Sequence, residues 1–320
     1  YGIRTLGAPQ NVSENIFSRQ DYGVWFTNIR HSELYITANS FNDFLSVPAR
    51  QGERAITLWN TTFNGNGMTK NITDNNIKHF KQGVSLTHEQ GVNIQNNEIT
   101  FDRLNPTSLW YGVRILGGSE NVINMNTMNR IGSPPDLGIS RSVFGVSIER
   151  SEQNGIYENE IYNLGAGIRF FVTSVENFVR CNNLIYNVDN LVTENALIGD
   201  QGSPHNASDN LWMINPFTEL QNSSDHGNIL NLGNDPTPRP TFYVQSLSGL
   251  DPDPMLTGDC PYICPGRAAT VVRGVDPSNS CSNNGCVDPS CYQDLIAQIV
   301  DEQAQYADLP DEQLEDARKY

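Results

Sequence analysis

Arginine and tryptophan recur at two positions of a repeating pattern, where glutamate occurs once, and these residue types can hold or cleave a sugar chain. Directly after a recurrent Gly-apolar or Ala-apolar dipeptide stand Arg4, Trp25, Thr57, Ser85, Arg114, Ser147 and Arg169. Two residues further on stand Leu6, Thr27, Trp59, Thr87, Leu116, Glu149 and Phe171. Guanidinium groups pair with carboxylates, and they also stack with aromatic rings. The candidate glycan-binding residues are therefore Trp25, Trp59, Arg114 and Arg169, and the alternative is a stacked surface without a ligand.

Catalysis would need further groups at these positions. Glycoside hydrolysis requires carboxylates that converge on one face, one of them acting as a general acid. Glu149 is the one carboxylate in the two sets, with Glu89 as a neighbour outside the alignment. A calcium-dependent lyase would need stacked aspartates and a base, and neither set contains an aspartate. No catalytic residue is assigned, and the scattered histidines are interpreted as surface or structural: His31, His79, His88, His205 and His226.

A repeat must position these side chains. Its openings are Gly2, Gly23, Ala55, Gly83, Gly112, Gly145 and Gly167, and an eighth unit begins at Asn190-Leu191-Val192. Between 13 and 20 residues after each opening comes an asparagine in an apolar-x-x-Asn-x-apolar frame. These asparagines are Asn15, Asn39, Asn75, Asn97, Asn126, Asn159 and Asn182. Recurrence of this kind is typical of solenoids, in which each unit buries its apolar side against its neighbours.

Apolar residues alternate with polar ones inside each unit, as Val146 and Ile148 do with Ser147 and Glu149. A period of two predicts short strands, and stacked units would pair equivalent strands in parallel. The asparagines would then form a structural ladder at one bend. Over about residues 1 to 200 the pattern resembles the right-handed parallel β-helix proteins of the pectate-lyase-like group. That fold carries lyases, hydrolases, epimerases, phage tailspikes and non-enzymatic surface proteins, so the resemblance predicts a fold and no single activity.

We predict an all-β solenoid: a right-handed, single-stranded parallel β-helix of about 7–8 coils, followed by a Pro- and Cys-rich segment and a short C-terminal helical hairpin. The β-helix would span residues 1–232 and lack its first coils, because no polar cap covers the first one. Residues 233–292 form a Pro-rich, disulfide-stapled linker in this scheme. Residues 293–320 form an amphipathic helical segment that continues beyond the chain.

Cysteine usage indicates the compartment. Cys260, Cys264, Cys281, Cys286 and Cys291 cluster without a CxxC pair or a nearby histidine. Disulfides explain this spacing better than zinc, and disulfides imply export. Five cysteines leave one over, so we predict that Cys181 pairs with one of them, the connectivity being open. No metal or other cofactor is expected; calcium at Asp276-Pro277-Ser278-Asn279 is the alternative considered.

The net charge of the chain restricts the classes of partner that the protein can bind. The formal net charge of the 320 residues is −16 and the pI is about 4.6, which argues against nucleic acid. No apolar run is long enough to span a membrane. The uncapped first coil predicts a larger chain, or a homo-oligomer or filament. We therefore predict a secreted, extracellular or cell-surface, non-catalytic structural or adhesive segment, whose layout resembles large surface proteins exported by type IX secretion. The alternatives are a polysaccharide lyase or glycoside hydrolase, and a carbohydrate-binding module for surface glycans.

Overall fold

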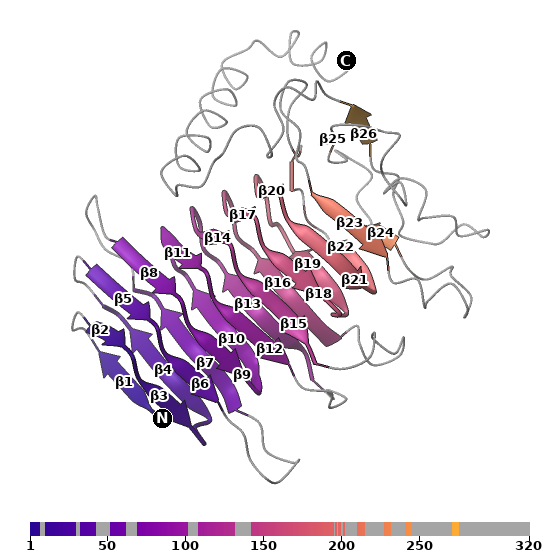
Figure 1. Cartoon of the computed structure of the whole chain (residues 1–320). Helices are drawn as coiled ribbons and strands as arrows, with labels where there is room; N and C mark the ends of the chain where they lie inside the picture. The colour runs from indigo at the N-terminus through magenta and orange to yellow at the C-terminus, as the bar shows by residue number, and fades with distance from the viewer. Residues whose placement is uncertain are drawn as a thin grey trace, which may run out of the picture. The chain divides into compact units, whose positions relative to one another are not determined.

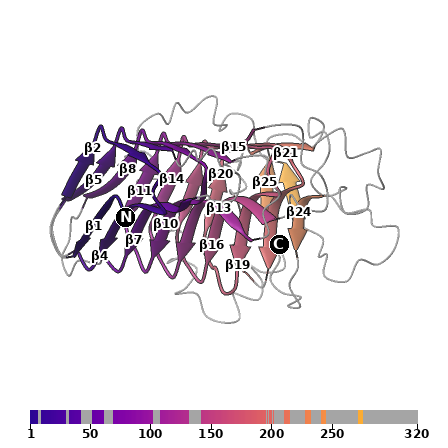
Figure 2. The ribbon, with the colours of Figure 1, turned by 90° about the horizontal axis from the view of Figure 1, so that it is seen from below.

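In the part of the chain that the computed structural model describes, the regular structure consists of parallel strands (Figure 1). The structure describes residues 1–6, 10–29, 33–42, 52–61, 69–101, 108–131, 142–194, 196, 198–199, 201, 210–214, 227–231, 241–244 and 271–274. Within this part, three sheets wind together into a β-helix whose coils follow one another in chain order, as Figure 2 shows. This confirms the predicted all-β parallel solenoid.

Sheet A contains the strand that opens each coil. Its members are β1 (Ile3–Leu6), β4 (Tyr22–Thr27), β7 (Gly52–Trp59), β10 (Phe80–Thr87), β13 (Trp110–Leu116), β16 (Val143–Glu149), β19 (Ala166–Phe171), β22 (Asp189–Glu194) and β24 (Gly227–Asn231). Val113 pairs with Val146, Val146 with Ile168, and Ile168 with Leu191. The repeat openings read from the sequence are therefore in register, including the eighth unit at Asn190.

Sheets B and C complete each coil. Sheet B contains β2 (Gln10–Ser13), β5 (Glu33–Thr37), β8 (Thr69–Thr73), β11 (Val92–Gln95), β14 (Val122–Asn124), β17 (Gly155–Tyr157) and β20 (Phe178–Arg180). Sheet C contains β3 (Ile16–Ser18), β6 (Ser40–Asn42), β9 (Asn76–Lys78), β12 (Glu98–Phe101), β15 (Thr127–Arg130), β18 (Glu160–Tyr162), β21 (Asn183–Asn187) and β23 (Leu211–Ile214). Seven consecutive coils thus contribute one strand to each sheet.

The apolar residues of the repeat fill the interior of the β-helix. Six apolar residues of the two central units are fully buried in one continuous cluster: Val146, Ile148, Ile156, Ile161, Ile168 and Phe170. Their alternating neighbours Ser147 and Glu149 therefore lie on the outer face of sheet A. Burial of this apolar surface is the main force that holds the coils together.

The glycine that stands at six of the seven openings, all but Ala55, has a steric cause. A Cβ atom on Gly145 would lie 2.5 Å from the carbonyl oxygen of Gly167 and 2.5 Å from Cγ2 of Ile161. Gly83 and Gly112 face the carbonyl oxygen of the following coil at 2.6 Å in the same way. The backbone here approaches both the next coil and the inward side chains of sheet C, which only a residue without a side chain allows.

Beyond the β-helix the structure describes little. Two short strands, β25 (Thr241–Val244) and β26 (Val271–Gly274), pair in parallel inside the segment predicted as a linker. That pairing is local structure that the proline-rich composition did not predict. The rest of the predicted linker and the predicted helices at 293–320 lie outside the described residues. Within the described part, no helix has the length and apolar character needed to cross a membrane.

Candidate functional site

The seven predicted ladder asparagines lie one above another at the bend between sheets B and C. From Asn15 to Asn182, each side-chain Nδ2 donates to Oδ1 of the next asparagine over 2.9–3.1 Å. Asn210 continues the ladder at 3.0 Å. The residue before each of the seven has a positive φ of 51–58°. The side-chain amides therefore satisfy a left-handed bend that would otherwise bury unpaired backbone groups.

A second asparagine ladder was not predicted from the sequence. Asn121 donates to Oδ1 of Asn154, and Asn154 donates to Oδ1 of Asn177, each over 2.9 Å. This ladder lies at the bend between sheets A and B, and Gln201 extends it by donating to the Asn177 carbonyl at 2.9 Å. The sequence does contain a signal for this second ladder, because each of the three asparagines stands five residues before a member of the first ladder.

The outer face of sheet A carries the candidate glycan-binding residues. The strand register stacks the two sets from the sequence in the predicted order, with Arg114 beside Ser147 and Leu116 beside Glu149. The four candidates divide into two groups. Trp25 and Trp59 lie on neighbouring strands with ring centroids 6.4 Å apart, whereas Arg114 and Arg169 lie several coils away around Glu149.

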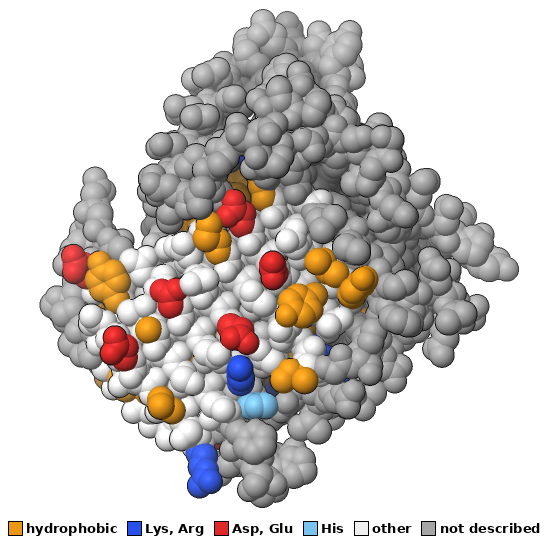
Figure 3. Space-filling view, viewed as in Figure 1, with side chains coloured by type: hydrophobic (Ala, Val, Ile, Leu, Met, Phe, Trp, Pro, Cys, Tyr) orange, Lys and Arg blue, Asp and Glu red, His pale blue; other side chains and the backbone are white. Residues whose placement is uncertain are grey.

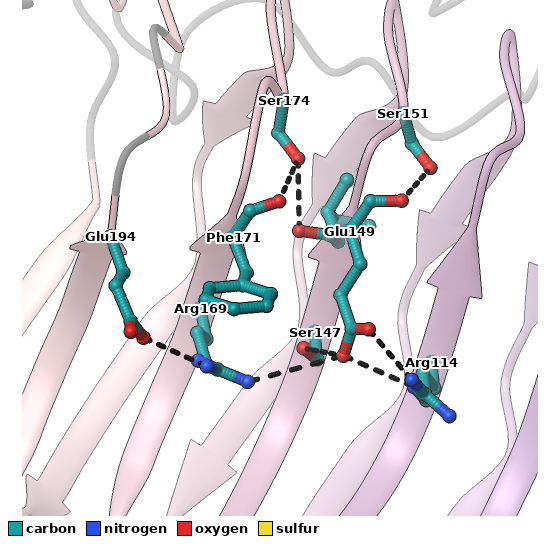
Figure 4. A network of polar contacts seen from close by, with 9 residues as sticks. Arg114, Ser147, Glu149, Ser151, Arg169, Phe171, Ser174 and Glu194 are labelled. Carbon is teal, nitrogen blue, oxygen red and sulfur yellow. Dashed lines mark hydrogen bonds and ion pairs between the residues drawn. The ribbon is translucent and has the colours of Figure 1, made fainter.

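Glu149 is the centre of an alternating charge ladder (Figure 4). Arg114 binds its carboxylate through two nitrogens, with Nε 3.0 Å from Oε1 and Nη2 2.7 Å from Oε2. Ser147 Oγ donates to Oε1 at 3.2 Å, and Arg169 Nη1 lies 3.9 Å from the same oxygen. Arg169 also donates through Nη2 to Oε2 of Glu194 at 2.8 Å. The carboxylate of Glu149 is therefore occupied by neighbours of its own sheet.

Aromatic rings enclose this charge ladder. Tyr111 and Phe144 stack with centroids 5.5 Å apart and are buried outside the main core with Ala166 and Val192. The Arg169 guanidinium lies over Phe144 at 5.0 Å and over Phe171 at 4.2 Å. Burial raises the pKa of the Tyr111 hydroxyl, and the negative charge of Glu149 adds to this effect. The hydrogen bond to Glu149 raises the pKa of the Arg114 guanidinium, so this guanidinium keeps its positive charge across the ordinary pH range.

Glu89, which the sequence placed near Glu149, lies instead inside the β-helix. Its buried carboxylate accepts hydrogen bonds from Lys70 Nζ at 2.7 Å and from the Thr61 backbone nitrogen at 2.6 Å. The Thr61 hydroxyl donates to the same group. Paired and hydrogen-bonded in this way, Glu89 serves the interior of the fold and cannot cooperate with Glu149 on the outer face.

The remaining site residues are dispersed. Cys181 is disulfide-bonded, while the five C-terminal cysteines and Asp276–Asn279 lie outside the described residues. His79 and His88 occupy separate bends with positive φ, and His31, His205 and His226 are not described. In the described ranges, no three His, Cys, Asp or Glu side chains gather as metal ligands. Acidic side chains on the face shown in Figure 3 are likewise scattered over the described surface.

Comparison with known proteins gives one match. A family model described as periplasmic copper-binding protein (NosD) matches residues 29–208 of this chain. The match covers more than half of the sequence and coincides with the central coils. No curated protein and no solved structure matches the chain.

Proposed function

The chain belongs to the NosD family, and from this premise we propose that it is an exported, non-catalytic β-helix with a structural or adhesive role at the cell surface. The family is described as periplasmic, which supports export of this chain. The disulfide at Cys181 fits an oxidising compartment, because disulfides are rare in the cytosol.

The state of Glu149 carries the proposal. A general acid or nucleophile must have a carboxylate oxygen directed at the scissile bond. Both oxygens of Glu149 instead bind Arg114, and one of them also accepts from Ser147. Glu194, which is next but one along the same set, is held by Arg169. These two carboxylates on the outer face of sheet A are thus committed to ion pairs that fix the surface.

Copper, which the family description names, does not fit the described residues. Copper sites in proteins use histidine, methionine and cysteine side chains. Here His79 and His88 occupy different bends, Met125 lies at a further bend beside Gln95, Met128 is fully buried in the apolar core, and Cys181 is disulfide-bonded. These donors are therefore dispersed over the described part of the chain.

The proposal predicts that the purified chain has no turnover on acidic polysaccharides. Reducing-end and unsaturated-product assays should give the same background for the wild type and for Glu149→Gln, because the Glu149 carboxylate is not available for proton transfer. Glu120→Gln is the matched control, since Glu120 is exposed and lies at a bend rather than on the face of sheet A. Product formation that survives in Glu120→Gln and is lost in Glu149→Gln would show an enzyme.

A further inference from the structure

The first coils present a group of aromatic rings on the outer face of sheet A. Tyr22 lies 5.1 Å from Trp25, Trp25 lies 6.4 Å from Trp59, and Tyr1 stacks on Tyr22 at 5.0 Å between centroids. Val24 and Phe26, which alternate with Trp25, are buried in the core, so the rings point away from it. Trp59 is 48% exposed. We call Tyr1, Tyr22, Trp25 and Trp59 the aromatic platform.

Two arginines border the platform without a carboxylate partner in the described part of the chain. Arg54 lies over the Trp25 ring at 5.9 Å, and Arg4 lies over Trp25 at 5.8 Å and over Tyr1 at 5.4 Å. Arg114 and Arg169, by contrast, bind Glu149 and Glu194. The positive charge available to a ligand on this sheet is therefore at Arg4 and Arg54, in a protein whose net charge is −16.

Polar atoms beside the platform are also unpaired. Nε1 of Trp25, Oγ1 of Thr57 and Oε1 of Gln82 have no hydrogen-bond partner among the described residues. The strand register places Thr57 next to Trp25, and Gln82 next to Arg54. Leaving such groups unpaired costs free energy. All three atoms are buried beneath the outer surface of this face, so a ligand on the platform does not reach them.

We propose that the aromatic platform, with Arg4 and Arg54, binds an acidic glycan, that is, a sugar chain that carries carboxylates. This deepens the proposed non-catalytic function and rests on it. The rings offer flat faces to sugar rings, and the guanidinium groups pair with carboxylates. The flat sheet runs across successive coils about 4.8 Å apart, which suits an extended chain rather than a compact ligand.

The experiment measures binding of charged and neutral sugar hexamers of equal length by isothermal titration calorimetry. Oligogalacturonate is the acidic probe and cello-oligosaccharide the neutral one. Trp59→Ala and Arg54→Ala should each weaken binding of the acidic hexamer roughly tenfold, which corresponds to about 1.4 kcal/mol, because each removes a direct contact with the sugar chain. Binding should also weaken as salt rises.

Two control variants lie away from the platform. Ile131→Ala removes a side chain that is 52% exposed, and Lys78→Ala removes a positive charge on sheet C. Both should bind the acidic hexamer as the wild type does. No binding of the acidic hexamer, or equal losses in the controls, would overturn the proposal. Tighter binding of the neutral hexamer would overturn its acidic part. Cleavage of a hexamer would instead refute the non-catalytic function and leave the site standing.

Discussion

At the scale of single residues, asparagine is the side chain on which the bends depend. Asn126 shows why: its Oδ1 accepts from both the backbone nitrogen and the side chain of Asn97. Its Nδ2 donates to the carbonyl oxygens of Ile94 and Asn124 and to Oδ1 of Asn159. Aspartate lacks the donors and serine lacks the reach, so neither could link three coils.

Asn126→Ala should lower the free energy of unfolding by about 3–5 kcal/mol, because several buried groups lose their partners at once. Asn15→Ala is the matched control. Asn15 is exposed and donates to Ser13 and Asn39, so its loss should cost about 1 kcal/mol. Equilibrium urea unfolding followed by circular dichroism measures both. Equal losses for the two variants would mean that the ladder is not cooperative.

The residue pattern predicted which side chains lie on sheet A, but it predicted less well what those side chains do. The sequence placed Trp25, Trp59, Arg114 and Arg169 on one face, and the structure does the same. The set contained both Arg114 and Glu149 but did not show that they pair, and Glu194, the partner of Arg169, joins the set only when the eighth coil is in register. Among the described arginines of sheet A, those without a carboxylate partner are Arg4, which stood in the set, and Arg54, which lies just before the dipeptide that opens the third unit.

At the scale of elements, close packing against the next coil and sheet C determines the residue type at the openings of sheet A. The sequence predicted the strands from their period of two, since alternation is a local property. The reason for glycine could not be predicted, because the contact is with a residue of the next coil and with sheet C. For the same reason the sequence placed Glu89 beside Glu149, although Glu89 lies in the interior.

Gly145→Ala tests this packing. Its Cβ would lie 2.5 Å from Gly167 O and from Ile161 Cγ2, so the coils must separate locally, and we expect a loss of at least about 2 kcal/mol. Gly91→Ala is the control, because its φ is +65° and its surroundings are open. That variant should lose only the backbone cost, about 1 kcal/mol. Thermal unfolding that ranks Gly91→Ala as the more damaging change would contradict the steric explanation.

At the scale of the whole molecule, the sequence repeat predicts how the coils stack, but it does not predict the structure of the C-terminal region. Each coil repeats the same apolar positions, so the β-helix could be derived from sequence alone. The chain after β24 lacks that repetition, and the strands β25 and β26 arise from contacts that no local period reveals. The sequence therefore predicts a link between this region and the β-helix only through its cysteines, which can join the two by a disulfide bond.

Cys181 should form its disulfide with one of the five cysteines between 260 and 291. The chain has six cysteines, Cys181 is disulfide-bonded, and an intrachain bond has no other partner to use. One such bond leaves four cysteines, an even number. It would close a loop of at least 79 residues (260 minus 181), which in the chain-entropy model stabilises the fold by roughly 4 kcal/mol.

Cys181→Ser should therefore unfold at a lower temperature than the wild type in oxidising buffer, and reductant should remove the difference. Peptide mapping without reductant identifies the partner, and a Cys181 peptide that alkylates freely before reduction would disprove the bond.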